Sequence, residues 1–132
     1  MLKKIHHIGI AVKDLDAAAE KYVAMTGVED FEKEYVKEQD VEVAMFEVGE
    51  SRIELLQGMS EKSPISRFLE KNREGLHHVA YEVEDISSVL KQLKEKNYRL
   101  IDQEPRTGAG GMKIAFVHPK STNGVLTELC QV

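Results

Sequence analysis

The sequence contains one pattern twice, and this repeat limits the folds that the chain can adopt. The segment His7-Ile-Gly-Ile-Ala-Val12 recurs 71 residues later (78 − 7) as His78-Val-Ala-Tyr-Glu-Val83, and each copy is followed by a charged residue, an aspartate and an aliphatic residue. Near the end of each half, Arg52-Ile-Glu-Leu55 is matched by Leu126-Thr-Glu-Leu129. Each half therefore has a histidine at its beginning and a glutamate, Glu54 or Glu128, near its end.

The two halves also share an order of predicted elements. Alternation of apolar and small residues predicts strands at 5–12 and 76–83. Asp14 and Asp85 are typical N-cap residues for helices that follow, at 15–26 and 86–97. We expect further strands at 30–37, 41–48 and 51–57 in the first half and at 98–102, 112–118 and 124–131 in the second. Ser63 and Pro64 predict a short linking helix at 65–71. The fold class is α+β, with two βαβββ units.

Charge and composition exclude some classes of function. A net charge of −5 argues against a nucleic-acid binder. The single cysteine, Cys130, has no partner for an internal disulfide, which suits the cytoplasm. No apolar run approaches the roughly 20 residues that span a bilayer, and the first residues do not resemble a signal peptide. We expect a cytoplasmic protein that binds neither nucleic acid nor membrane.

The repeated histidines and glutamates form a candidate metal site. Strand parity places His7 with Gly9 and Ala11, and places Glu54 opposite Ile53 and Leu55. A carboxylate on a buried sheet face must be paired, hydrated or bound to a cation. Two imidazoles and two carboxylates suit a divalent first-row metal, so Co²⁺, Mn²⁺, Ni²⁺, Fe²⁺ and Zn²⁺ all stay open. The alternative is that both histidines are structural, as we expect for His6 and His77, which face the other way.

Six segments resemble the vicinal oxygen chelate (glyoxalase/bleomycin-resistance) superfamily and, within it, the methylmalonyl-CoA epimerase family. They are Ile5–Val12, Ser63–Leu69, Gly75–Val79, Thr107–Gly111, His118–Ser121 and Gly124–Leu129. The resemblance implies one domain over residues 1–132, with modules at about 1–60 and 75–132 joined by a linker helix at about 63–72. The paired modules form a cupped mixed sheet around a metal. Members of the superfamily usually associate, so we also expect a homodimer.

The resemblance implies His7, His78 and Glu128 as metal ligands. Glu54 falls on a fourth position where family members carry Gln or Glu. Gln57 lies close by, but strand parity puts it on the opposite face, so Glu54 is preferred. Co²⁺ is the expected metal.

The implied reaction interconverts (R)- and (S)-methylmalonyl-CoA by abstraction of the C2 proton through a metal-stabilised enolate. Inversion needs proton transfer on two faces, and the candidate bases are Glu128 and Glu42. Parity would let Glu42 point into the cup. The alternative is that Glu42 is an exposed edge-strand glutamate, and the base is then a metal-bound water or another side chain. The CoA tail needs phosphate contacts, for which Lys120 and Lys113 are the candidates, and Gly110 and Gly111 permit close backbone approach to the substrate. The alternative is a hairpin with solvated lysines.

Two other functions fit the same residues less well. One is a glyoxalase I-like isomerase of a glutathione hemithioacetal, which uses a similar ligand set. The other is a metal-free drug-binding protein, which has no need of His7, His78 and Glu128. An extradiol dioxygenase also uses two His and one Glu, but in longer chains.

Overall fold

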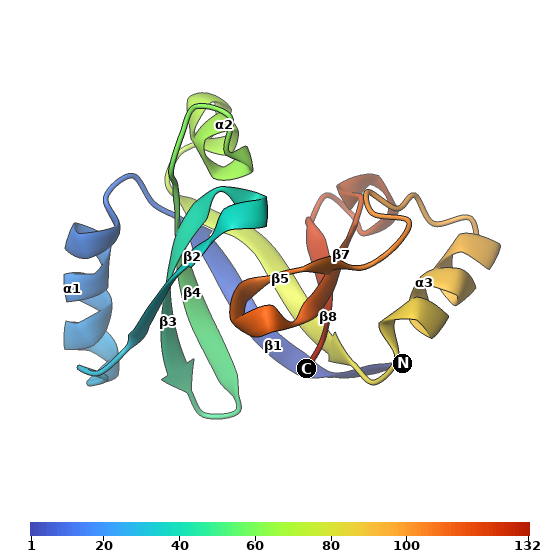
Figure 1. The fold of residues 1–132 in the computed structure, drawn as a ribbon, viewed down its shortest axis with the longest axis horizontal. Helices are drawn as coiled ribbons and strands as arrows, with labels where there is room; N and C mark the ends of the chain where they lie inside the picture. Colours follow the sequence, from blue (N-terminus) through green and yellow to red (C-terminus); the bar gives the residue numbers. More distant parts are fainter. The chain divides into compact units, whose positions relative to one another are not determined.

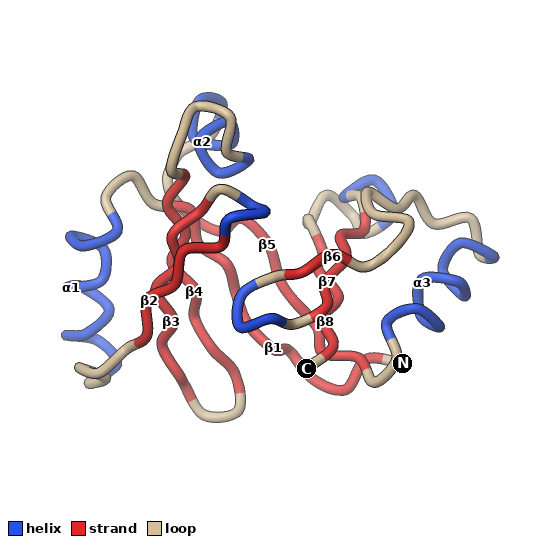
Figure 2. Tube along the Cα trace, in the orientation of Figure 1, coloured by secondary structure: helices blue, strands red, loops and turns tan.

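The computed structural model describes residues 1–132, and the chain divides into two compact units. The first unit is His7–His77, and the second unit combines Met1–His6 with His78–Val132. Two strands, β1 (Leu2–Ala11) and β5 (Gly75–Val83), therefore contribute residues to both units. Within the second unit, the Lys3 ammonium lies 3.4 Å from the Glu82 carboxylate. The elements are labelled in Figure 1 and distinguished by type in Figure 2.

The first unit is a four-stranded mixed sheet with a helix packed on one face. Its strand order is β2-β3-β4-β1, in which β1 and β4 are parallel and the other neighbours are antiparallel. After β1 the elements are α1 (Leu15–Thr26), β2 (Glu32–Val36), β3 (Val41–Val48), β4 (Ser51–Gly58) and α2 (Pro64–Lys71). Figure 1 shows α1 alongside β2, β3 and β4.

Helix α1 has the ends that its sequence predicts. The Asp14 side chain accepts a hydrogen bond from the Ala17 N–H at the N-terminus. At the C-terminus Gly27 adopts φ 77°, a left-handed conformation that favours glycine. Leu15 and Ala19 turn toward the sheet and pack against Phe46 and Leu55, so this face of the sheet is the core of the first unit.

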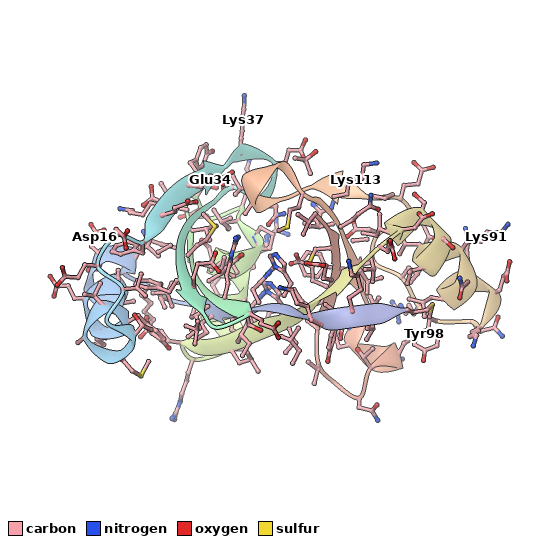
Figure 3. The ribbon with its side chains drawn as sticks, turned by 90° about the horizontal axis from the view of Figure 1, so that it is seen from below. Asp16, Glu34, Lys37, Lys91, Tyr98 and Lys113 are labelled. Carbon is pink, nitrogen blue, oxygen red and sulfur yellow. The ribbon has the colours of Figure 1, made fainter.

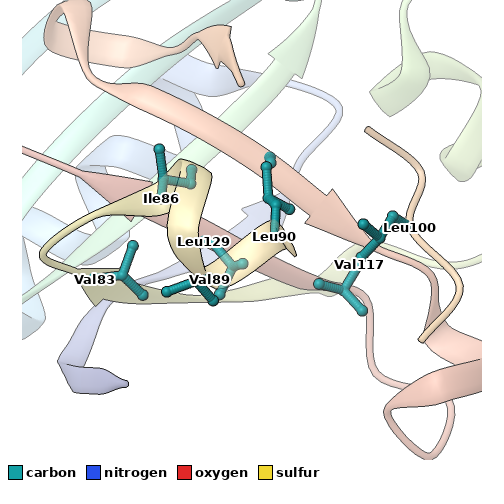
Figure 4. Close-up of a cluster of buried hydrophobic side chains, with 8 residues drawn as sticks. Val83, Ile86, Val89, Leu90, Leu100, Val117 and Leu129 are labelled. Carbon is teal, nitrogen blue, oxygen red and sulfur yellow. The ribbon is translucent and has the colours of Figure 1, made fainter. Parts of the chain in front are cut away.

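The second unit repeats this arrangement. Its strand order is β5-β8-β7-β6, with β5 and β8 parallel. The elements after β5 are α3 (Ile86–Glu95), β6 (Arg106–Thr107), β7 (Lys113–Val117) and β8 (Thr127–Gln131). Short 3₁₀ turns at Ala109–Gly111 and Pro119–Ser121 flank β7. Helix α3 covers one face of the sheet, and Figure 4 shows the apolar cluster between them, which includes Val83, Ile86, Leu90 and Leu129. The predicted α+β class and the repeated βαβββ order are confirmed.

The predicted strand at 98–102 is wrong. Only Leu100 forms an isolated bridge, to Val117, and the strand beside β7 is the two-residue β6. The N–H groups of Ile101 and Asp102 both donate to the Phe116 carbonyl, and the Asp102 carboxylate takes the Phe116 N–H at 2.8 Å. A side chain thus replaces a backbone carbonyl here, which ends regular pairing.

The helices lack the combination of length and apolar character that crossing a bilayer requires.

Candidate metal centre

The first unit holds a buried histidine–glutamate pair on the sheet face that α1 does not cover. His7 lies on β1 and Glu54 on β4, where Gly9 is the parallel neighbour of Glu54. The His7 Nδ1 atom is 3.4 Å from the Glu54 Oε2 atom. Only 2% of His7 and 3% of Glu54 is exposed. Glycine and alanine at positions 9 and 11 leave room beside these side chains, as parity predicts.

An arginine accompanies this pair. The Arg52 guanidinium lies 4.0 Å from the Glu54 carboxylate and 2.9 Å from the Glu47 carboxylate. A nearby positive charge offsets part of the cost of burying Glu54 as a carboxylate. Arg52 therefore places a positive charge beside this pair.

The second unit holds the equivalent pair. His78 lies on β5 and Glu128 on β8, where Ala80 is the parallel neighbour of Glu128. The His78 Nε2 atom is 3.1 Å from the Glu128 Oε1 atom. The exposed fractions are 4% and 5%. This face of the sheet is again the one that the helix of its unit leaves uncovered, because α3 packs on the face that carries Leu129.

Each pair fits neighbouring ligands of one metal ion. Ligand atoms about 2.1 Å from an ion are about 3.0 Å apart when their directions are perpendicular and about 3.4 Å apart at the tetrahedral angle. The observed separations of 3.1 and 3.4 Å fall at these values. Imidazole nitrogen with carboxylate oxygen is a donor set that first-row divalent metals accept. The residues present therefore fit a divalent metal.

Glu42 does not share a face with Glu54, so the expectation that it points the same way as the candidate ligands is wrong. Its strand neighbours Ala44 and Phe46 pack in the α1 core, and its carboxylate lies 3.6 Å from the Lys33 ammonium. Lys33 is also hydrogen-bonded to Asp16 of α1 at 3.0 Å, and this bond contributes most to raising the pKa of the Lys33 ammonium. Glu42 thus belongs to an ion-pair group on the α1 side of the sheet.

Gln57 also lies on the α1 side, as its parity predicts. Its Oε1 atom accepts a hydrogen bond from the Leu15 N–H, at 2.7 Å, at the first turn of α1. Gln131 makes the equivalent bond in the second unit, from the Ile86 N–H at 2.9 Å. Sequence analysis missed this role, although both glutamines follow the repeated glutamates by three residues.

The residues expected to contact CoA lie in or next to the 3₁₀ turns of the second unit. Lys113 is exposed at the beginning of β7 (Figure 3). Lys120 is exposed in the Pro119–Ser121 turn. Gly110 and Gly111 have φ values of 68° and 76°, so this turn requires residues that tolerate a left-handed backbone.

His118 begins the Pro119–Ser121 turn. Its Nδ1 atom accepts the Lys120 N–H at 3.0 Å. Desolvation, and then the positive charges of Arg99 and Lys120, lower the pKa of His118. The neutral imidazole is therefore the form that suits this turn.

His77 and Cys130 make the packing contacts that are typical of structural residues. The His77 ring packs edge-on against Phe68 of α2, with ring centroids 4.9 Å apart. Cys130 is fully buried, and its Sγ atom lies 3.5 Å from the Tyr81 carbonyl. A cavity of about 350 Å³ beside α1 is lined by Asp16, Ala19, Glu20, Val23 and Phe31, and so lies on the opposite face of the sheet from Glu54.

Comparison with known proteins finds relatives that match the chain along its whole length. A protein of Cereibacter sphaeroides named ethylmalonyl-CoA/methylmalonyl-CoA epimerase is 42% identical, covering 100% of both chains. The human mitochondrial methylmalonyl-CoA epimerase is 38% identical, covering 98% of this chain and 74% of the relative.

Solved structures agree with these relatives. A methylmalonyl-CoA epimerase in complex with methylmalonyl-CoA and NH₄⁺ superposes with a TM-score of 0.94 at 41% identity, covering 99% of this chain and 95% of the other. The same values hold for a variant of the Streptomyces coelicolor enzyme in complex with 2-nitronate-propionyl-CoA. Residues 6–116 match the profile of the Glyoxalase/Bleomycin resistance protein/Dioxygenase superfamily. With its repeated βαβββ units and a His–Glu pair in each, the chain belongs to this superfamily.

Proposed function

We propose that this protein is an epimerase that interconverts (R)- and (S)-methylmalonyl-CoA by moving the proton on C2. The observation that carries the proposal is the full-length similarity to methylmalonyl-CoA epimerases, at 38–42% identity. The buried His–Glu pair in each unit supports it, since both pairs lie at the positions where the family resemblance implies metal ligands.

The four residues His7, Glu54, His78 and Glu128 hold one divalent metal ion in this proposal, with Co²⁺ as the preferred ion. The repeat supports a shared ion, because the two pairs are equivalent and each supplies one nitrogen and one oxygen donor. When bound, the metal acts as a Lewis acid toward the negative charge that develops when C2 loses its proton.

The chain's own residues then move the proton. C2 of the substrate lies between a thioester and a carboxylate, so its proton is acidic once the resulting charge is stabilised. Glu128 is the carboxylate that we assign to proton transfer on one face of C2 as well as to metal binding, and water is the proton donor and acceptor on the opposite face. Glu42 has no such role here, because it lies with Lys33 on the α1 side of its sheet.

The CoA part of the substrate needs contacts to its phosphates. We assign these to Lys113 and Lys120, both exposed in the second unit, and assign close backbone approach to Gly110 and Gly111. Lysine suits phosphate as a mobile point charge, which matches the exposed positions of both side chains.

We further propose that two copies associate and that the protein works in the cytoplasm. Leu2, Ile5 and Leu76 are apolar strand residues that are 52%, 44% and 56% exposed in the single chain. Association with a second copy would remove such side chains from water. Light scattering should give the mass of a dimer, and a monomer at micromolar concentration would contradict the association. The cytoplasm is supported by the single cysteine.

The test of the reaction is proton NMR of Co²⁺-loaded protein with methylmalonyl-CoA in D₂O. We expect the C2 proton signal to disappear as both epimers form, and expect a chelator to stop the exchange. Ethylmalonyl-CoA is run in parallel, because one relative is named for both substrates. Absence of exchange from metal-loaded protein would overturn the proposal, and turnover of a glutathione hemithioacetal would then favour the glyoxalase alternative.

A further inference from the structure

The second unit surrounds its His–Glu pair with an aromatic ring that sequence analysis did not single out. The Phe116 ring lies edge-to-face with the His78 imidazole, with ring centroids 5.6 Å apart and an interplanar angle of 85°. Phe116 is also the cross-strand neighbour of Glu128 in the antiparallel pairing of β7 with β8. One side chain therefore lies beside both members of the pair.

Phe116 is itself held at two points by one ion pair. Asp102 accepts the Phe116 N–H through its Oδ2 atom at 2.8 Å, and its Oδ1 atom lies 2.9 Å from Nε of Arg106. The Arg106 guanidinium carbon lies 6.0 Å from the centroid of the Phe116 ring, within the range of a cation–π contact. Asp102 thus fixes the backbone of Phe116, and Arg106 lies over its ring.

The imidazole needs such a neighbour because its terminal torsion is soft. Rotation about the Cβ–Cγ bond of histidine is broad and has no single narrow minimum. An edge-to-face contact prefers one relative orientation of the two rings, so a fixed Phe116 restricts the rotation of His78. The restricted orientation is the one that leaves Nε2 of His78 3.1 Å from Glu128.

The first unit has no copy of this arrangement at the corresponding place. The residue opposite Glu54 across the β3–β4 pairing is Met45, whose sulfur lies 3.7 Å from an Arg52 nitrogen. The repeat conserves the His–Glu pairs but places different side chains beside the two carboxylates. The aromatic neighbour is therefore a particular feature of the second unit.

We propose that Phe116, held by Asp102 and Arg106, is a positioning residue that orients the His78 imidazole toward Glu128 for metal binding. The inference rests on the proposed function only in assigning a metal to this pair. The orientation of the ring is a property of the metal-free protein and is measured separately.

The test uses the full chain with Phe116→Leu, which removes the ring. In metal-free protein, NMR of the His78 imidazole should show loss of the ring-current shift and broader or averaged ring signals. Calorimetric titration with Co²⁺ should show about tenfold weaker binding, the lower end of the effect expected for residues that orient a metal ligand. The visible absorption spectrum of bound Co²⁺ should also change. Phe116→Tyr keeps the ring and should restore all three readouts.

Two further variants separate positioning from general stability. Phe31→Leu removes another partly buried ring, which stacks on Phe46 in the α1 core, and should lower the melting temperature without changing the affinity for Co²⁺. Arg106→Lys keeps the positive charge but loses the planar guanidinium over the ring. Because Arg106 is 40% exposed in its side chain, this variant should fold, and it should shift the His78 signals in the same direction as Phe116→Leu.

His78 ring signals as sharp in Phe116→Leu as in the wild type would overturn the inference, because the loss of the ring-current shift alone follows from removing the ring. So would Co²⁺ binding by Phe116→Leu at wild-type affinity. Failure of the wild-type protein to bind Co²⁺ would instead contradict the proposed metal site, and the metal-free His78 signals would still decide whether Phe116 orients the ring.

Discussion

The direction of single side chains decides which carboxylates can act together. Glu54 and Glu42 lie on neighbouring strands, but Glu54 is 3% exposed beside His7, whereas Glu42 lies beside Lys33 on the other face. In the second unit, Glu128 is the acid beside His78. A candidate base is therefore identified by the face of the strand on which it lies, and not by its distance along the sequence from other candidate residues.

Glu42→Gln tests this distinction. We expect the rate of deuterium exchange at C2 to stay within about twofold of the wild type, because Glu42 does not face the metal ligands. Stability should change little, since the ion pair with Lys33 is open to solvent, with side chains that are 40% and 33% exposed. Glu128→Gln should lower the rate by at least about 100-fold, the usual contribution of a catalytic base. A large loss of rate in Glu42→Gln at unchanged melting temperature would restore Glu42 as a catalytic residue.

His118 should give the protein a measurable pH dependence of stability. Its pKa in the folded state lies below the ordinary value of 6.5 because of desolvation and the charges of Arg99 and Lys120. The unfolded chain then binds a proton more readily than the folded chain, so the stabilisation is fully present above pH 6.5 and is lost as the pH falls through the folded-state pKa. Urea unfolding at a series of pH values should show this loss.

The matched variant for this measurement is His118→Asn. Asparagine does not titrate, and its side-chain oxygen can accept the Lys120 N–H in place of the imidazole. The difference in unfolding free energy between the two proteins should therefore change between about pH 7 and pH 5, with the wild type losing more. A difference that is constant with pH would show that His118 does not titrate differently in the folded and unfolded states.

At the scale of elements, the sequence is informative where one face of a strand is polar or small. β1, β4 and β8 alternate, so the facing of His7, Glu54 and Glu128 within their own strands was predictable. β3 carries no such signal, because Val41, Val43, Ala44, Met45 and Phe46 are all buried and both faces of the strand are covered. The parity that groups Glu42 with Ala44 and Phe46 is right, but the prediction that this face points into the cup is wrong. The strand prediction for 98–102 failed for another reason. There the Asp102 carboxylate, rather than a backbone carbonyl, accepts the hydrogen bond from the Phe116 N–H.

The repeated glutamines should each stabilise a helix–strand junction. Gln57 accepts the Leu15 N–H at the first turn of α1, and Gln131 accepts the Ile86 N–H at the first turn of α3. The first N–H groups of a helix have no partner within the helix, so a side chain that accepts one stabilises the fold. Gln57→Ala and Gln131→Ala should each lower the free energy of unfolding by about 1 kcal/mol, measured by denaturant unfolding.

Gln92→Ala is the control for these variants. Gln92 is an exposed residue of α3 whose amide lies 3.3 Å from the Ser88 hydroxyl. Its replacement should change stability by less than about 0.5 kcal/mol. Equal effects of all three replacements would mean that the bonds to the helix N-termini contribute nothing beyond the loss of a glutamine side chain.

For the whole molecule, the repeat leaves two possible numbers of bound metal ions. Each unit has its own His–Glu pair, so the chain binds either one shared ion or two. We expect one Co²⁺ per chain, because a pair supplies two donors whereas protein metal sites of this type use three or four protein ligands. Metal present at about 100 times its dissociation constant should stabilise the folded chain by about 2.7 kcal/mol.

Variants in either unit decide between one ion and two. With a shared ion, His7→Ala and His78→Ala should each abolish the Co²⁺-dependent rise in melting temperature, although they change different units. His77→Gln should keep the rise, because the His77 ring packs against Phe68. Separate ions would instead give a stoichiometry of two and leave one ion bound after either replacement. Calorimetric titration gives the number of Co²⁺ ions bound per chain, and melting curves with and without chelator give the rise in melting temperature. Together these two quantities decide whether the chain binds one ion or two.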